Sequence, residues 1–164
     1  MIQCKRIRPD RFHQIDPTEA VFRMGRPTIL VPEQVHELRA DRIILGWKDT
    51  KEARLAVLSS LPFLVRASQV TITEICTSDE QDEARQRVHS VAAYLQKHGA
   101  KCRTEVRVHM AESDAHHLIR LAEEDDADLI VAGAYGHSRL GERIFGGMTR
   151  GLIEHSPCCL LMSH

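Results

Sequence analysis

The sequence has no apolar run long enough to cross a membrane as a helix. Its first residues, MIQCKRIRPDRFHQ, lack the apolar core of a secretion signal. Basic and acidic residues nearly balance, with a formal net charge of −1. The chain as a whole therefore lacks the excess of positive charge that is typical of nucleic-acid-binding proteins. We therefore expect a cytoplasmic protein with neither a membrane nor a nucleic-acid partner. Its 164 residues suggest one principal domain with room for a core.

The cysteines do not form a recognisable metal or redox motif. There are five, an odd number, and no C-x-x-C spacing occurs. Four of them lie in or beside apolar runs: Cys76, Cys102, Cys158 and Cys159. We interpret them as small core residues in a reducing compartment, since the alternative, a zinc site, lacks its ligand spacing.

Signs of catalysis are also scarce. Neither G-x-S-x-G nor G-x4-G-K-[ST] occurs, and no Ser/His/acid arrangement can be identified. We expect no enzyme, or a weak ATPase at most. His109, His116 and His117 could converge on a metal, but a solvated histidine pair is the simpler reading.

From Asp41 onward the pattern alternates between apolar runs and helical periodicity. We expect strands at 42–46, 70–76, 102–109, 129–132 and 158–162, and helices at 50–64, 83–98, 113–126 and 148–155. Thr50 and Ser113 can cap the helices that begin there. This alternation predicts a three-layer α/β/α fold with a parallel sheet between helices. Ligands in such folds bind at the carboxyl ends of the strands.

Residues 1–40 form an extension before the domain at 41–164. We expect residues 1–18 to be an irregular lead-in and residues 17–24 a short helix capped by Thr18. Thr28–Val31 then reads as a strand that Pro32 ends. Because prolines flank it, an edge position is expected.

A glycine-rich stretch follows the apolar run at 129–132. Gly133 and Gly136 open a polar loop, and Gly146-Gly147 precede a helical pattern. Glycines let a backbone approach an anion closely, and a helix N-terminus attracts it. Sequence alone thus predicts a phosphate cradle. Within the loop, His137 could donate to a phosphate or simply face solvent, and Arg139 is the better anion contact because its guanidinium is a fork of donors.

The spacing Gly133-x2-Gly136-x9-Gly146 resembles that of the universal stress protein family, whose nucleotide-binding members carry G-x2-G-x9-G-[ST]. Thr149 after the glycine pair and the run His155-Ser-Pro-Cys158 support the resemblance, which covers residues 41–164. It implies a five-stranded parallel sheet of order 3-2-1-4-5 and a role in the stress response. It also implies binding of an adenine nucleotide such as ATP, and commonly homodimers formed through the last strand.

The resemblance also assigns roles to residues. The phosphates would lie on the glycines of the loop and the helix start behind them, and Ile75 would flank the base. Trp47 could stack on the base or close the pocket. The implied binding set is Trp47, Lys48, Ile75, Gly133, Gly136, His137, Arg139, Gly146, Gly147, Met148 and Thr149.

Two positions depart from the nucleotide-binding pattern. Gly147 replaces the family's Ser or Thr. This removes a hydroxyl that could form a hydrogen bond to a phosphate, and such a bond contributes about 1 kcal/mol to binding. Lys48 stands where the family has Asp, and a lysine can neutralise phosphate but cannot hold Mg²⁺. Asp49 could substitute only if the turn shifts by one residue. The alternative is therefore a scaffold or interaction domain that binds no nucleotide.

The extension resembles part of a second domain. The run Gly25-Arg-Pro-Thr-Ile-Leu-Val-Pro is similar to the end of the first domain in tandem stress proteins. The chain thus looks like the C-terminal half of a tandem protein. From this resemblance we predict that Thr28–Val31 pairs antiparallel with Cys158–Met162, either within one chain or between two. Such pairing would cover an edge strand that otherwise invites aggregation.

Overall fold

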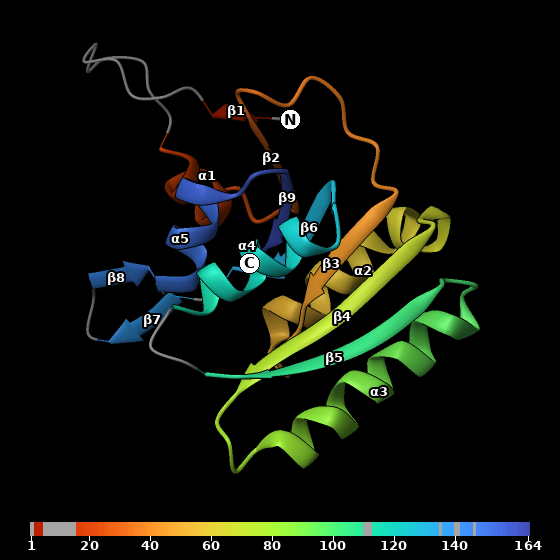
Figure 1. Ribbon diagram of the computed structural model, residues 1–164. Coiled ribbons are helices and arrows are strands. Elements are labelled where there is room, and N and C mark those ends of the chain that lie inside the picture. Colours follow the sequence, from red (N-terminus) through yellow and green to blue (C-terminus); the bar gives the residue numbers. More distant parts are fainter. Residues whose placement is uncertain (1, 5–15, 110–112, 135, 140–141, 146) are drawn as a thin grey trace.

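The computed structural model describes residues 2–4, 16–109, 113–134, 136–139, 142–145 and 147–164, and these form a three-layer α/β/α arrangement (Figure 1). The strands are β1 (Ile2–Cys4), β2 (Thr28–Pro32), β3 (Arg42–Gly46), β4 (Gln69–Cys76), β5 (Cys102–Val108), β6 (Leu129–Gly133), β7 (Gly136–Arg139), β8 (Glu142–Phe145) and β9 (Cys159–Ser163). The helices are α1 (Pro17–Arg23), α2 (Lys51–Arg66), α3 (Gln81–Lys97), α4 (Asp114–Glu124) and α5 (Gly147–His155).

The main sheet runs in the order β1-β2-β9-β6-β3-β4-β5. Its five parallel strands are β3, β4, β5, β6 and β9, so the predicted order 3-2-1-4-5 is confirmed. Strand β3 lies at the centre, where Ile43 pairs with Val70 on one side and with Leu129 on the other. The inner strands β3, β6 and β9 are mostly apolar because helices cover both faces of the sheet.

Each face of the sheet has its own apolar cluster. Ile43 and Leu45 of β3 pack with α2 and α3, whereas Ile44 packs with α1, α4 and α5. Side chains of successive strand residues point to opposite faces, which explains why neighbours on β3 join different clusters. Outer strand β5 is only half-buried, as its alternating sequence predicts for an edge.

Helix starts follow local capping chemistry. The Thr50 hydroxyl accepts from the Ala53 amide at 3.2 Å, and Ser113 caps α4, both as predicted. The cap predicted for the first helix was wrong. Asp16, not Thr18, caps α1, because its carboxylate accepts from the Thr18 amide at 2.9 Å and Pro17 occupies the first helical position.

The N-terminal strand pairs as predicted. Strand β2 lies antiparallel to β9 within the same chain, with Thr28 opposite Met162 and Leu30 opposite Leu160. The lead-in is not wholly irregular, which corrects the sequence expectation. Strand β1 adds to the free edge of β2 in parallel, with Ile2 opposite Leu30, and so extends the sheet by one short strand.

The sequence predicts a plain loop between Gly133 and the last helix, and this prediction was wrong. Strands β7 and β8 form an antiparallel hairpin that stands apart from the main sheet (Figure 1). Ile144 and Phe145 supply β-forming residues to it. The glycine-rich stretch was misread because its polar residues and glycines dominate the pattern.

Two acidic residues at the end of α4, Glu124 and Asp125, are paired with residues of neighbouring strands. The Thr71 hydroxyl donates to the Asp125 carboxylate at 2.8 Å, and Arg103 donates both to that carboxylate and to the Thr71 hydroxyl. Glu124 likewise accepts from Arg107 at 2.6 Å. These bonds tie the C-terminus of α4 to β4 and β5, and they offset the unfavourable position of acids at this end of a helix.

Asp125 makes folding sensitive to acid. Partial burial by itself raises the pKa of Asp125, but the bonds from Arg103 and Thr71 outweigh burial and hold this pKa below its usual value. A carboxyl whose folded pKa is depressed contributes stability above its unfolded pKa of about 4, and that stability is lost as the pH falls through the lower folded value.

We therefore expect Asp125→Asn to flatten the fall in unfolding free energy below about pH 4. Urea unfolding across a pH series measures the slope. Asp126→Asn, at the exposed neighbouring position, is the matched control and should keep the wild-type slope. Equal slopes in the Asp125 variant and the wild type would contradict this account.

Candidate functional site

A cavity of about 440 Å³ opens at the carboxyl ends of β3, β4 and β6. This is where the parallel topology predicts a ligand site, because the chain order reverses on either side of β3. The residues that line it are Gly46, Trp47, Lys48, Thr50, Ala53, Thr73, Ile75, Asp114, Leu118, Ala132, Gly133, Gly147, Met148 and Thr149.

Two helix N-termini border this cavity. Thr50 and Ala53 bring the start of α2 to it, and Gly147 with Thr149 brings the start of α5. The amide groups of a first helical turn have no partner within their own helix, so each end attracts an anion. Sequence reasoning predicted both helices but assigned an anion-binding start only to α5, although the Thr50 cap was a usable signal for α2.

Gly133 is required by packing. A Cβ atom added there would lie 2.6 Å from the Ala53 amide nitrogen and 2.8 Å from the carbonyl carbon of Glu52. The first turn of α2 therefore rests directly on the end of β6. Close approach of two backbones explains this glycine without a phosphate.

Gly147 is not required by packing. A Cβ atom at this first residue of α5 would have no neighbour within 4 Å. A serine or threonine side chain therefore fits the position that the family pattern gives to a hydroxyl. Packing therefore does not explain why position 147 lacks a hydroxyl.

Polar groups line the deeper wall of the cavity. Thr73 is 1% exposed, and its hydroxyl has no hydrogen-bond partner within the described part of the chain. The Asp114 carboxylate lies 2.7 Å from the imidazole Nδ1 of His109. Sequence reasoning placed neither Thr73 nor Asp114 in the binding set. A hydroxyl within the β-branched strand run was the one available signal for Thr73.

Residues after β3 are placed by backbone bonds. The Trp47 amide donates to the Thr73 carbonyl at 2.8 Å, and the Trp47 side chain packs against the apolar cluster under α2 and α3. Lys48 lines the cavity, whereas Asp49 pairs with Arg54 and lines a neighbouring groove. The one-residue shift that would bring Asp49 into the site does not occur.

Seven of the eleven predicted binding residues come together at the cavity: Trp47, Lys48, Ile75, Gly133, Gly147, Met148 and Thr149. Gly136 begins β7, and His137 and Arg139 follow on the same strand. Gly146 lies outside the described residues, as do the side chains of His137 and Arg139. Their contribution to binding stays a prediction.

The histidines are dispersed by their local packing. His117 is 1% exposed, which corrects the expected solvated pair, and its Nδ1 lies 3.3 Å from Arg120. His116 is exposed and its ring stacks on His155 with centroids 6.0 Å apart. Across the described ranges, no three His, Cys, Asp or Glu side chains gather so as to hold a metal ion.

Three cysteines are core residues. Cys76, Cys158 and Cys159 are buried, whereas Cys102 is half-buried, and burial raises the pKa of Cys158 to about 12. A thiol with so high a pKa is not a nucleophile at neutral pH.

Within the described part of the chain, no helix is both long and apolar enough to cross a bilayer.

Comparison with known proteins agrees with this geometry. The profile of the universal stress protein family matches residues 51–164. Universal stress protein Sll1388 of Synechocystis is 27% identical over 155 residues, which cover 85% of this chain and 98% of that protein.

Solved structures share the fold. A universal stress protein from Archaeoglobus fulgidus aligns with a TM-score of 0.59 at 21% identity, over 73% of this chain and 95% of that one. A universal stress protein solved in complex with cAMP aligns with a TM-score of 0.60 at 18% identity, over 76% and 96%. Because the family profile covers most of the chain, this protein belongs to the universal stress protein family.

Proposed function

We propose that this chain is a stress-response module that binds an adenine nucleotide, ATP or a close relative, in the cavity at the ends of β3, β4 and β6. The observation that carries the proposal is the convergence of two helix N-termini, α2 and α5, on one cavity. Its volume of about 440 Å³ lies within the range of about 300–1,000 Å³ that is usual for small-molecule sites. The related structure that contains cAMP supports a nucleotide as the ligand.

Both charged and buried polar residues line the cavity. The phosphates would lie against the start of α5, with Lys48 supplying positive charge. The base would lie beside Ile75 and the hydroxyl of Thr73, which has no hydrogen-bond partner among the described residues and can both donate and accept. Gly136, His137, Arg139 and Gly146 would add phosphate contacts, as the family resemblance implies.

Lys48 affects whether the site can hold Mg²⁺. An ammonium group cannot coordinate Mg²⁺, which prefers carboxylate and phosphate oxygens. Asp49 pairs with Arg54, and Asp114, the carboxylate that does line the cavity, lies 2.7 Å from His109 Nδ1. We therefore propose that the nucleotide binds without needing Mg²⁺. Slow hydrolysis is not supported, because it would require an organised water and a metal ligand.

A second candidate function is a scaffold or protein-interaction domain whose cavity holds no nucleotide. Gly147 and Lys48, the two departures from the nucleotide-binding pattern, favour it. Homodimer formation, a cytoplasmic location and descent from half of a tandem protein stay predictions from the sequence.

A thermal-shift titration with ATP, with and without Mg²⁺, separates the two candidates. Binding at a ligand concentration of 100 Kd should add about 2.7 kcal/mol of stability. For a domain of this size that corresponds to a rise in Tm of roughly 5–10 °C. The absence of a shift at millimolar ATP and at millimolar cAMP would contradict nucleotide binding and leave the scaffold function.

Gly147→Ser should tighten nucleotide binding about fivefold, since it returns a hydroxyl bond worth about 1 kcal/mol at a position with open space. Isothermal titration calorimetry measures the change. Gly147→Ala is the matched control, because it adds the Cβ atom without the hydroxyl. Equal gains in both variants would show that the hydroxyl plays no part.

A further inference from the structure

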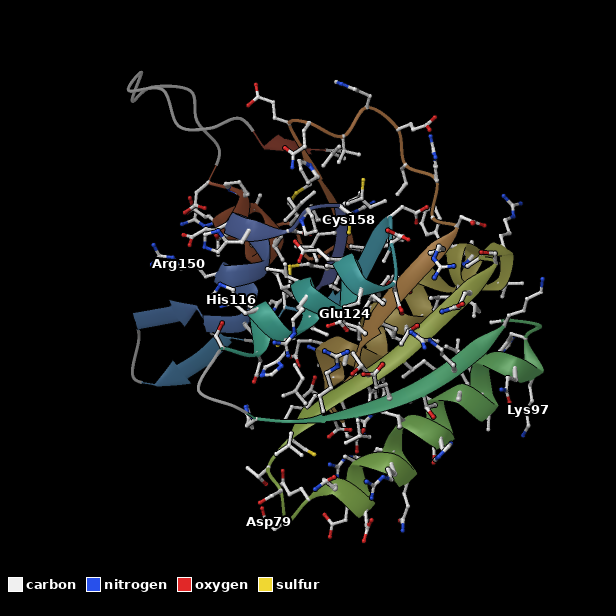
Figure 2. All side chains as sticks on the ribbon, viewed as in Figure 1. Asp79, Lys97, His116, Glu124, Arg150 and Cys158 are labelled. Carbon is white, nitrogen blue, oxygen red and sulfur yellow. The ribbon has the colours of Figure 1, made fainter. Side chains whose placement is uncertain are left out.

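We infer that the chain has a second small-molecule site, in the groove between α2 and α3, which takes a flat apolar molecule bearing one anionic group. The groove has a volume of about 450 Å³ and shares Trp47 with the nucleotide cavity. Helix α3 runs from the end near Asp79 to Lys97 along one side of the molecule (Figure 2). This inference does not depend on nucleotide binding.

The floor and rim of the groove are apolar. Val57 of α2 and Val91 of α3 are buried at its floor, with 4% and 8% exposure. Leu58 and Tyr94 lie on its lining yet remain 56% and 38% exposed. A single exposed leucine is ordinary, but apolar side chains from two helices around one concavity form a patch that an apolar ligand would cover.

Hydrogen-bond donors outnumber acceptors in the side chains around the groove. Arg54 and Arg87 contribute guanidinium groups, and Asp49 is the only carboxylate among the residues described as lining it.

Arg87 is held in place from below. The Glu74 side chain is 3% exposed and accepts from Arg87 Nε at 3.0 Å and from Nη2 at 2.7 Å. These bonds occupy one edge of the guanidinium and leave Nη1, whose carboxylate neighbour, Glu83, lies 3.8 Å away. A fixed guanidinium with spare donors is a suitable partner for a carboxylate or sulfonate.

Arg54 can exchange its partner. Its ion pair with Asp49 is exposed on both sides, at 59% and 51%. Exposed pairs of this kind contribute little stability, so a ligand anion can replace Asp49 at small cost. Together, a fixed and an exchangeable guanidinium beside an apolar floor favour an aromatic anion.

The probe for the test is 8-anilinonaphthalene-1-sulfonate, an aromatic anion. Trp47 is the only tryptophan in the sequence, so energy transfer from its fluorescence to the probe reports binding near Trp47. Because Trp47 also lines the nucleotide cavity, the α2 variants below assign the bound probe to the groove. On the full chain we expect saturable binding of one molecule. Binding of the neutral analogue N-phenyl-1-naphthylamine should be at least about fivefold weaker, the loss expected from one charge-assisted bond of about 1 kcal/mol or more.

Substitution of either of two α2 residues by glutamate tests whether the probe binds in the groove. Leu58→Glu places a charge on the rim and should weaken binding of the sulfonate at least about tenfold. Val65→Glu, on the same helix but not among the residues that line the groove, is 37% exposed in the wild type and should leave binding unchanged. Non-saturable binding, equal effects of both variants, or equal affinity for the neutral analogue would each overturn the inference.

Discussion

Deletion of residues 1–36 is expected to make the protein self-associate and to lower its stability by several kcal/mol. The deletion removes β2, so β9 loses its partner on one edge. An uncovered, apolar edge strand is a template for pairing with another chain. Val21 and Leu30, which are 1% and 3% exposed, also leave the core, and each such side chain contributes about 1.5–3 kcal/mol when buried.

Size-exclusion chromatography with light scattering measures the association, and urea unfolding measures the stability. Deletion of residues 1–15 alone is the matched control, since it keeps α1 and β2 and leaves β9 covered. It removes β1 and so frees the outer edge of β2, but Pro27 and Pro32 make that edge a poor template for pairing. We expect this shorter deletion to retain the size of the intact chain. If the chain that begins at residue 37 kept the solubility and size of the intact protein, β2 would have no role in covering β9.

Gly133→Ala is expected to cost about 1–3 kcal/mol and to abolish nucleotide binding, because overpacking against backbone cannot be relieved by a side-chain rotation. The added Cβ atom would lie 2.6 Å from the Ala53 nitrogen, so the first turn of α2 must move. That turn borders the nucleotide cavity. The expected fall in Tm is roughly 2–4 °C for each kcal/mol.

Gly147→Ala makes the same chemical change at the other end of the hairpin and serves as the control. Its Cβ atom would meet nothing within 4 Å, so we expect an unchanged Tm within about 1 °C, as for a surface substitution. Thermal unfolding with and without ATP measures both variants. Similar behaviour of the two would contradict the claim that Gly133 is required by packing.

Much of the sheet was predictable because the apolar sequences of its inner strands indicate that these strands are buried. Leu129–Ala132 and Ile43–Leu45 are continuous apolar runs, and continuous runs are typical of strands buried on both faces. The caps at Thr50 and Ser113 were equally legible, since capping depends on residues only a few positions apart. The antiparallel pairing of β2 with β9 was predicted from the family resemblance, not from local pattern.

Other features depend on contacts between residues far apart in the chain. Thr73 faces the cavity because β4 lies next to β3, and nothing near it in sequence marks that role. The hairpin β7–β8 forms where glycines and polar residues predict a loop. The pairing of Asp125 with Arg103 joins positions that no local pattern connects.

The sequence by itself determined the alternation of strands and helices, the glycines at 133 and 147 and the lysine at 48, because these follow from local pattern or simple identity. Only the tertiary structure distinguished the two glycines. Gly133 is confined by the backbone of α2, whereas Gly147 has open space around it. That difference depends on which elements approach each other, since packing is decided by three-dimensional contact and not by spacing along the chain.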